Sequence, residues 1–321
     1  MIITRIDCGM GNQMFAYAAG FVTAERLKTE LLLDLEWFRK KQPRKDPRPY
    51  ELSCFPGINE RRASFSDVYR LFPFQAVINY LYGKNIFWFT GRHFIREIMT
   101  ALMLLPEGKS RRKFLESDPV LLPIPRSRVF TQEGSIYSEK FTMIPDDTYI
   151  WGAWQNEKFF DGFHDKLRRK FTFSPEYFQN DYAEKIRACN SAAIHVRLGD
   201  KLRRGESGFT CEYVRHSIRK LLSLAEGAKF FVFSDNTEWC RKNLPLIDDA
   251  EYIFVEGNTP AQDMALMTLC KNVITAASTF SWWAAWLNEN PNKIVIAPAQ
   301  KLWRGDDSFR EIYPSEWIVM E

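Results

Sequence analysis

The second half of the chain alternates short apolar runs with longer amphipathic stretches, a pattern that indicates strands and helices in turn. The apolar runs predict strands at 192–196, 229–233, 252–255, 272–275 and 293–297. The stretches between them predict helices at 212–226, 260–270 and 280–287. Alternation of this kind is typical of a doubly wound α/β domain, whose parallel sheet binds ligands at the carboxyl ends of its strands.

The first half opens with the same pattern. The sequence predicts a strand at 2–6, a turn containing two glycines, a helix at 12–27 and a strand at 31–33. A strand at 149–154 and a helix at 165–170 follow after a region rich in Phe, Leu and Arg. We therefore expect an α/β protein of two domains with parallel sheets. The expected boundaries are a first domain at 1–188, a second at 189–300, and a C-terminal tail at 301–321 that packs back on the first domain.

Composition narrows the function classes. The 321 residues include 44 Lys plus Arg and 40 Asp plus Glu, and the resulting net charge of +4 argues against a dedicated nucleic-acid binder. Hydrophobic residues make up 45% of the chain, which is too many for a disordered protein. The six cysteines are scattered without a C-x-x-C pair, which favours reduced thiols over disulfides or a zinc site. Aromatic residues reach 15%, and composition does not decide whether they fill a core or line a ligand site.

No targeting segment is predicted. The first nine residues lack the long apolar run of a secretory signal, and charged residues interrupt the apolar region at 86–105. We therefore expect a cytoplasmic protein. The basic loop at 39–48 and the Arg- and Phe-rich region at 87–112 are candidates for peripheral contact with anionic lipid on the inner face of the membrane. An exposed, solvated loop is the interpretation that the pattern favours for 39–48.

One cluster of candidate chemistry follows the predicted strand 192–196. Arg197 offers a planar fork of donors suited to two phosphate oxygens, and Gly199 allows the chain to turn sharply. The competing interpretation is a surface turn with a structural Arg–Asp pair. His195 taken alone is more often a hydrogen-bonded structural histidine than a base.

A second cluster stands between the predicted strand 272–275 and the helix 280–287. Ser278 and Thr279 could donate there to a diphosphate together with the N-terminus of the helix. Three tryptophans follow at spacings that favour a packed surface, so this stripe is interpreted as core: Trp282, Trp283 and Trp286.

Two other places are ambiguous. The turn at Gly9–Gly11 lets backbone N–H groups approach an anion, but a dinucleotide fingerprint needs a glycine where Met14 stands. A plain tight turn is the equal alternative. Asp235 and Asn236 follow the strand 229–233 and can read a ribose or a base, yet both are also ordinary turn residues.

Several chemistries have no motif here. The sequence contains no H-E-x-x-H, no G-x-x-x-x-G-K-[ST], no G-x-S-x-G and no D-x-D pair for a metal-bound nucleotide sugar. No metal ligands are therefore predicted.

Taken together, four segments resemble the α-1,2-fucosyltransferases of glycosyltransferase family 11. They occur in the family's order: GNQMF at 11–15, HVRLGD at 195–200, FSDN at 233–236 and STFSWWAAWLN at 278–288. The resemblance runs from about residue 1 to residue 297. The chain departs from the family at Leu198, where a second arginine is frequent, at Met10, where leucine is frequent, and at Ala284, where glycine is frequent.

The resemblance implies a GT-B-like architecture of two facing Rossmann-like domains. The N-terminal domain would be the acceptor side, and the C-terminal domain would bind GDP-β-L-fucose. Catalytic roles are implied for Arg197, His195 and Asp200, with Arg197 and His195 meeting the diphosphate and the fucose. Donor contacts are implied for Asn12, Arg197, Asp235, Asp263, Ser278, Thr279 and Phe280. Within that set, Asp263 receives the guanine or ribose, and Asn12 approaches the fucose from the other domain.

The implied reaction is inverting transfer of L-fucose to the 2-hydroxyl of a terminal galactose, in glycan, O-antigen or capsule synthesis. Because GDP leaves as a diphosphate, the site needs positive charge and N–H donors, and we expect no metal and no other cofactor. Asp7, Asp200 and Glu206 are the candidate bases. The expected acceptor is a galactose-terminated oligosaccharide or a lipid-linked glycan.

Two alternatives remain open. One is a related GT-B glycosyltransferase that uses another nucleotide sugar, and the other is a non-catalytic sugar-binding module. Among the aromatic residues, Phe280, Trp151 and Trp154 are the candidates for touching substrate.

Overall fold

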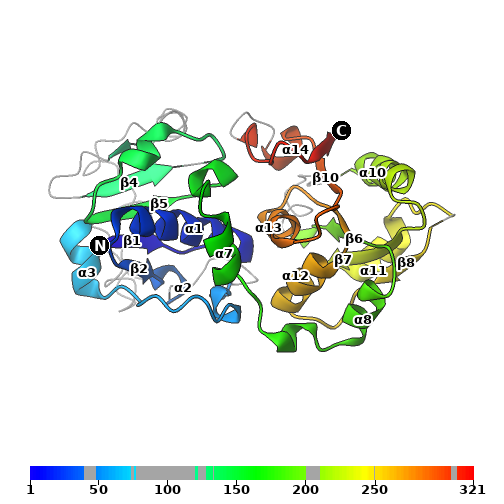
Figure 1. The fold of residues 1–321 in the computed structure, drawn as a ribbon, viewed down its shortest axis with the longest axis horizontal. Coiled ribbons are helices and arrows are strands. Elements are labelled where there is room, and N and C mark those ends of the chain that lie inside the picture. The colour runs from blue at the N-terminus through cyan, green and yellow to red at the C-terminus, as the bar shows by residue number, and fades with distance from the viewer. Residues whose placement is uncertain are drawn as a thin grey trace, which may run out of the picture. The chain divides into compact units, whose positions relative to one another are not determined.

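The computed structural model describes residues 1–39, 48–73, 76, 120–121, 128–132, 134–199, 210–248, 250–304 and 309–321. These residues form two compact units, each with its own sheet (Figure 1). Unit 1 comprises residues 1–52 and 58–167, and unit 2 comprises residues 53–57 and 168–321.

Unit 1 contains a five-stranded sheet in the order β2-β1-β5-β4-β3. Its strands are β1 (Ile2–Arg5), β2 (Leu31–Asp34), β3 (Val120–Leu121), β4 (Val129–Gln132) and β5 (Thr148–Gly152). The pairs among β2, β1, β5 and β4 are parallel, whereas β3 runs antiparallel to β4. The helical segments are α1 (Met10–Leu27), α2 (Glu36–Arg39), α3 (Phe65–Leu71), η3 (Glu139–Met143) and η4 (Glu157–Phe160). Two more, η1 (Leu52–Cys54) and α7 (His164–Lys170), begin in unit 1 and end in unit 2.

The helix α1 packs directly against β1 (Figure 1). The middle of α1 is rich in alanine and glycine, so the two backbones approach closely. A Cβ at Gly20 would lie 2.8 Å from the Cβ of Thr4. The Thr4 hydroxyl in turn donates to the carbonyl of Ala16 at 2.9 Å. This contact fixes where α1 begins and therefore where the turn before it lies.

Unit 2 contains a six-stranded parallel sheet in the order β11-β10-β9-β6-β7-β8. Its strands are β6 (Ser191–Val196), β7 (Lys229–Ser234), β8 (Tyr252–Phe254), β9 (Asn272–Ile274), β10 (Val295–Pro298) and β11 (Ile318–Met320). The helical segments are η5 (Pro175–Phe178), α8 (Asp181–Arg187), α10 (Cys211–Leu224), α11 (Thr237–Asn243), α12 (Pro260–Leu269), α13 (Thr279–Leu287) and α14 (Lys301–Arg304). Its hydrophobic core includes Ile194, Phe230 and Ile296, which are fully buried.

The strand order reverses once in each unit, beside the first strand. In unit 1, β1 lies between β2 and β5, and in unit 2, β6 lies between β7 and β9. The connections that leave the two central neighbours therefore lead to opposite faces of the sheet. Doubly wound sheets bind their ligands at this position. The expected fold class, α/β with two Rossmann-like units and parallel sheets, is confirmed.

The boundary between the units differs from the expected 188/189. The chain passes to unit 2 at residue 168, and the separate segment 53–57 also belongs to that unit. Packing is the reason: Phe55 lies 4.7 Å from Phe173 and 5.2 Å from Phe171, ring centroid to ring centroid. The helices η5 and α8 contact α12 in the same unit.

The C-terminal residues also depart from expectation. Instead of a tail on the first domain, Ile318–Met320 forms β11 and pairs with β10 in the second sheet. The indole N–H of Trp282 donates to the carbonyl of Ile312 at 2.7 Å, which ties the same region to α13. The edge of the second sheet offers unpaired backbone groups, and the C-terminal strand satisfies them.

Within the described residues, no helix has the length and apolar character that a membrane span requires. Most of the segments proposed for lipid contact, 39–48 and 87–112, lie outside the described residues.

Candidate functional site

Arg197 stands just past the carboxyl end of β6 and is held by Asp235. Nη1 of Arg197 lies 2.8 Å from Oδ2 of Asp235, and the two side chains are 23% and 24% exposed. The other oxygen of Asp235 accepts from the backbone N–H of Leu198 at 2.9 Å. Strand register causes this meeting, because β6 and β7 pair with Val196 opposite Ser234. The structural Arg–Asp pair considered above therefore exists, and its acidic partner comes from the next strand.

The two residues that follow Arg197 complete this arrangement. A Cβ at Gly199 would lie 2.6 Å from Oδ2 of Asp235, so a side chain at this position would displace the carboxylate that holds Arg197. Leu198 is only 3% exposed and belongs to the core of unit 2. Its side chain points away from the carboxyl edge, so this departure from the family's second arginine leaves Arg197 and its partner unaltered.

His195 and Phe280 meet across the point where the strand order reverses. His195 lies in β6 and is 7% exposed. Its ring centroid is 5.4 Å from that of Phe280, in the first turn of α13, and the planes are tilted by 37°. Because α13 begins just after β9, the switch point of the sheet brings these distant residues together.

The N-terminus of α13 carries the small hydroxyl residues. Ser278 is the N-cap residue, yet its side chain makes no capping hydrogen bond, and Ser278, Thr279 and Phe280 are all partly exposed. The hydroxyl of Ser281 instead accepts from the N–H of Ala276 at 3.2 Å. The first turn of α13 therefore presents the positive end of a helix dipole and two hydroxyl groups at the carboxyl edge of sheet 2.

The three tryptophans of α13 are core residues, as interpreted. Trp282, Trp283 and Trp286 are at most 3% exposed. Trp283 packs edge-on against Phe171 at 5.1 Å between ring centroids, and Arg168 lies over the ring of Trp286 at 4.3 Å. They anchor the helix behind the exposed first turn.

A cavity of about 260 Å³ lies beside the same edge, at the ends of β7 and β8. Its lining includes four acidic residues, Asp235, Glu238, Glu256 and Asp263, together with Asn258. Burial raises the pKa of Asp263 to about 6. The side-chain N–H of Asn258 donates to Oδ1 of Asp263 at 3.1 Å, which favours the ionised form. The cavity thus offers carboxylate acceptors, Asp263 among them, for N–H or O–H donors of a ligand.

The structure brings most of the sequence-predicted residues to one edge of sheet 2. His195, Arg197 and Asp235 follow β6 and β7, Asp263 lines the adjoining cavity, and the 278–280 turn follows β9. Asp200 and Glu206, two of the candidate bases, lie outside the described residues. Among the residues that are described, no three His, Cys, Asp or Glu side chains are grouped as metal ligands would be.

The turn before α1 in unit 1 is occupied by a protein carboxylate. The N–H of Met10 donates to Oε2 of Glu51 at 2.8 Å. Gln13 holds the same segments together, since its side chain donates to the carbonyls of Cys8 and Pro49 and accepts from the N–H of Glu51. A negative group already satisfies the end of α1, so the structure favours the tight-turn interpretation of Gly9–Gly11 over the anion-binding one.

Other predicted residues of unit 1 lie at the carboxyl edge of sheet 1. Asn12, in the first turn of α1, accepts through Oδ1 a hydrogen bond from Nε2 of Gln155 at 2.9 Å. Arg5 lies 4.3 Å over the ring of Trp151 and 3.1 Å from Asp7. Asp7 is therefore an ion-paired candidate base.

Trp154 does not touch substrate. Its side chain is fully buried and packs at 5.4–6.1 Å between ring centroids on a cluster of aromatic rings: Phe130, Phe141 and Phe159. The prediction that it contacts a ligand is wrong because the side chain is enclosed by this cluster. The backbone at Trp154 has a φ of +55°.

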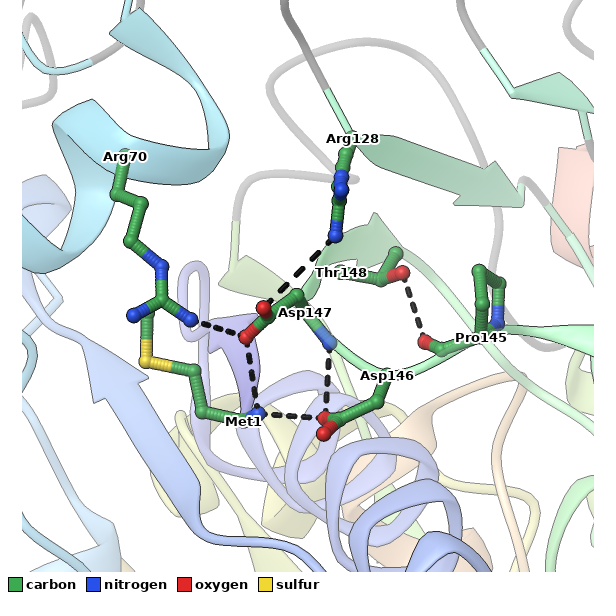
Figure 2. A network of polar contacts seen from close by, with 7 residues as sticks. All are labelled: Met1, Arg70, Arg128, Pro145, Asp146, Asp147 and Thr148. Carbon is green, nitrogen blue, oxygen red and sulfur yellow. Dashed lines mark hydrogen bonds and ion pairs between the residues drawn. The ribbon is translucent and has the colours of Figure 1, made fainter.

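A cluster of charged groups lies at the opposite edge of sheet 1 (Figure 2). The N-terminal ammonium of Met1 contacts Asp146 and Asp147, and Arg70 and Arg128 approach Asp147. The hydrogen bond from that ammonium lowers the pKa of Asp146. These groups neutralise one another at the amino ends of the strands, so this cluster is structural.

The sequence of the chain matches a known protein family. The profile of glycosyl transferase family 11 matches residues 131–321, more than half of the chain. The chain belongs to glycosyl transferase family 11. It is a glycosyltransferase by family, which argues against the non-catalytic sugar-binding module.

Several relatives of this family 11 chain are named as glycosyltransferases of one kind or another. It is 29% identical to alpha-1,2-colitosyltransferase of Escherichia coli, covering 100% of this chain and 99% of that one. It is 24% identical to the O-antigen biosynthesis glycosyltransferase WbnK of Escherichia coli, covering 97% of both. It is 27% identical to galactoside alpha-(1,2)-fucosyltransferase 1 of Homo sapiens, over 53% of this chain and 52% of that protein.

Solved structures are more distant. The NodZ alpha-1,6-fucosyltransferase soaked with GDP-fucose aligns with a TM-score of 0.46 at 18% identity, covering 89% of this chain and 91% of that one. POFUT1 in complex with GDP aligns with a TM-score of 0.46 at 15% identity, covering 92% and 98%.

Proposed function

We propose that this family 11 enzyme transfers L-fucose from GDP-β-L-fucose, with inversion, to the 2-hydroxyl of a terminal galactose. The observation that carries the proposal is the carboxyl edge of sheet 2. At its switch point an oriented arginine and the N-terminus of α13 stand beside a cavity that holds a carboxylate. A cationic site joined to a polar cavity suits a nucleoside diphosphate.

The leaving group explains the need for Arg197. Breaking the bond between fucose and GDP develops negative charge on the diphosphate, and the fork of a guanidinium can neutralise two of its oxygens. Asp235 holds one side of that fork in place, so the group is oriented before the donor binds. Ser278, Thr279 and the free end of α13 add hydroxyl and backbone donors to the same charge. One such donor is commonly worth about 2.7–4 kcal/mol of transition-state stabilisation.

The nucleoside would occupy the cavity at the ends of β7 and β8. Guanine carries N–H donors on the edge that ordinarily pairs with cytosine, and ribose carries hydroxyl donors. The carboxylate of Asp263, with a pKa of about 6, is ionised above that pH and accepts from either group. Asp235 contributes mainly through Arg197, because both of its oxygens already have partners.

The sugar and the acceptor are assigned to the remaining candidate residues. His195, whose ring packs on Phe280, is assigned to the fucose, and Asn12 to the same sugar from unit 1. Asp200, Asp7 and Glu206 are the candidate bases. The acceptor is proposed to be a galactose-terminated oligosaccharide or a lipid-linked glycan.

A product-linkage assay tests the proposal. The purified chain is incubated with GDP-fucose and a panel of β-galactosides, and the product's linkage and anomeric form are read by NMR. We expect an α-1,2-linked fucose, which is inverted relative to the β-linked donor. A product with a different linkage, or release of GDP without glycoside formation on any galactoside, would contradict it.

Colitose is the second candidate for the transferred sugar, because the relative that matches over the whole chain is named a colitosyltransferase. Running the assay with GDP-fucose, GDP-colitose and UDP-sugars in competition separates the donors. The donor with the highest kcat/KM identifies the sugar and the nucleotide.

Two further properties are part of the proposal. Transfer is expected to proceed without a metal, so full activity in excess EDTA is the expected result, and loss that Mg²⁺ or Mn²⁺ restores would contradict it. The enzyme is proposed to work in the cytoplasm, with peripheral contact at the inner face of the membrane. Sedimentation with anionic vesicles measures that contact.

A further inference from the structure

Gln155 fixes the side chain of Asn12 and is absent from the four segments that carry the family resemblance. Nε2 of Gln155 donates to Oδ1 of Asn12 at 2.9 Å, joining the chain after β5 to the first turn of α1. The two residues are 143 positions apart, and the contact forms because β1 and β5 are neighbours in the sheet. Gln155 is 7% exposed, whereas Asn12 is partly exposed.

The backbone around Gln155 is rigid. Its own N–H donates to the carbonyl of Gly134 at 3.1 Å, and the next side chain, Asn156, donates to the carbonyl of Ser135 at 2.7 Å. Trp154 precedes it with a φ of +55°, a backbone conformation uncommon outside glycine, and is locked among aromatic rings. The turn at Gly152 admits no side chain, because a Cβ there would lie 2.2 Å from the carbonyl oxygen of Gln132.

This rigidity gives the Asn12 amide one orientation. An amide has a carbonyl acceptor on one side and an NH₂ donor on the other. Since Oδ1 faces Gln155, the NH₂ group faces the opposite way, toward the partly exposed side of the turn. In this orientation the buried Oε1 of Gln155 has no hydrogen-bond partner among the described residues. The reverse orientation would instead leave the buried NH₂ group of Gln155 without an acceptor, and unpaired buried N–H donors are rarer in native structures than unpaired carbonyl oxygens.

We propose that Gln155 is a positioning residue that sets the polarity of Asn12, so that the carboxyl edge of sheet 1 offers hydrogen-bond donors to a sugar oxygen. This rests on the proposed function, in which Asn12 contacts the transferred sugar. Asn12 then stabilises negative charge or lone pairs on that sugar or its leaving oxygen, and does not serve as a base. Gln155 acts through Asn12 and does not itself touch the substrate.

The experiment is a double-mutant cycle. Gln155→Glu replaces the donor with a carboxylate that accepts, which turns the Asn12 amide and presents its carbonyl to the substrate. We expect kcat to fall about tenfold or more, the scale of one lost hydrogen bond to a charged or polarised group. The affinity for GDP alone, measured by calorimetry, is expected to stay within about twofold of wild type. Asn12→Ala combined with Gln155→Glu is expected to be no worse than Asn12→Ala alone, because both remove the same contact.

Gln155→Met keeps the volume without either donor or acceptor and serves if Gln155→Glu folds poorly. We expect a smaller loss of kcat, since the Asn12 amide can then rotate. A pH profile gives an independent readout. The activity of Gln155→Glu relative to wild type should rise as pH falls, because a protonated carboxyl regains a donor for Oδ1.

Gln132→Met is the matched control. Gln132 is a buried glutamine of β4, in the same sheet, whose side chain donates to the carbonyl of Ile136 at 2.7 Å. We expect it to lower the unfolding temperature as Gln155→Met does, with kcat unchanged. The positioning role is wrong if both methionine variants leave kcat unchanged. It is also wrong if the kcat losses of Asn12→Ala and Gln155→Glu multiply in the double variant.

The cycle is run with whichever nucleotide sugar the wild-type enzyme transfers. Failure to transfer fucose from GDP-fucose would overturn the proposed function alone. Multiplying losses with a working donor would overturn the role of Gln155 alone.

Discussion

The helices α1 and α13 begin at equivalent places in the two units, yet their N-termini are used differently. Each starts at the carboxyl edge of its sheet, beside the point where the strand order reverses. At α1 the carboxylate of Glu51 accepts from the first helical N–H. At α13 the N-cap Ser278 makes no side-chain capping bond and is partly exposed.

The difference teaches where an anion can bind. A helix N-terminus attracts negative charge only while it lacks a charged partner of its own. Glu51 already fills that role in unit 1, so the glycine turn there is structural. In unit 2 the open end stands near Arg197, and the same local design becomes a candidate diphosphate site. Each prediction below changes one side of this contrast.

The largest effect is expected from Leu198→Arg. The family often has a second arginine here, which would strengthen the cationic edge of unit 2 if the side chain reached it. Leu198 is instead buried among apolar residues, and an unpaired charge there costs several kcal/mol. We expect destabilisation of about 4 kcal/mol or more in urea unfolding. Leu198→Met, which keeps the volume, should cost less than about 1.5 kcal/mol. An arginine variant as stable as wild type would show that position 198 faces the carboxyl edge of the sheet.

Arg197→Ala is expected to remove most of the transfer activity. Losing the main cation at the diphosphate should lower kcat about 100- to 1000-fold, in line with 2.7–4 kcal/mol for a lost anion contact. The fold should persist, because Asp235 keeps its bond from the Leu198 N–H. Arg219→Ala, on the exposed face of α10, is the control and should leave kcat unchanged. Retention of more than about a tenth of wild-type kcat would remove Arg197 from the site.

Asp263→Asn tests the cavity through pH. The pKa of Asp263 is raised from 3.8 to about 6 because burial penalises the charge. The folded state therefore binds more protons than the unfolded state between these values. Its contribution to stability is fully present below about pH 4 and is lost as pH rises through about 6. The loss is on the order of 2–3 kcal/mol.

The measurement is the unfolding free energy of wild type and Asp263→Asn from pH 4 to pH 7. Wild type should lose stability over this range relative to the variant, which has no carboxyl to ionise. Affinity for GDP should also fall below pH 6 in wild type and not in the variant. Parallel pH curves would place the ionisation elsewhere.

Glu51→Ala should destabilise α1 without changing the binding of GDP. Removing the carboxylate leaves the first helical N–H without its partner, at a cost of about 1 kcal/mol. Thermal unfolding is expected to shift downward accordingly, while GDP affinity stays at the wild-type value. A change in GDP affinity greater than about threefold would mean that the end of α1 takes part in nucleotide binding.

Ser278→Ala is the converse variant and should have the smallest effect. Because the Ser278 side chain makes no capping bond, stability should change by less than about 0.5 kcal/mol. The KM for the donor should rise about three- to tenfold, the scale of one hydrogen bond. Lower stability with an unchanged KM would assign Ser278 the same structural role that Glu51 has at α1.

Much of the fold was predictable because periodicity is local. The apolar runs predicted β1, β2 and the strands of unit 2 to within one or two residues, as Ile2–Arg5 and Ser191–Val196 show. The short helices α8 and α11 were missed, whereas α7, which is equally short, was predicted from its amphipathic run. β11 was missed because a three-residue strand at an edge acquires its structure only from β10.

The residues of the candidate site were likewise only partly predictable from the sequence. Residue type and position pointed to Arg197 and Ser278, because cations and hydroxyls at strand ends carry their chemistry with them, whereas Asp263 in α12 came only from the family resemblance. Partners were not predictable: Asp235 holds Arg197 through the register of two strands, and Gln155 holds Asn12 across 143 positions. The burial of Trp154 depended likewise on the aromatic rings that enclose it, which the sequence pattern does not encode.

The sequence by itself determined the strands, the helices and the chemical groups at their ends, because these follow from short-range patterns and residue identity. Tertiary structure alone decided which helix end is occupied and which is open. Glu51 reaches α1 from 41 residues away, and β9 returns beside β6 to bring Phe280 onto His195. Both outcomes depend on strand order, which is set by how whole elements pack and not by any one segment.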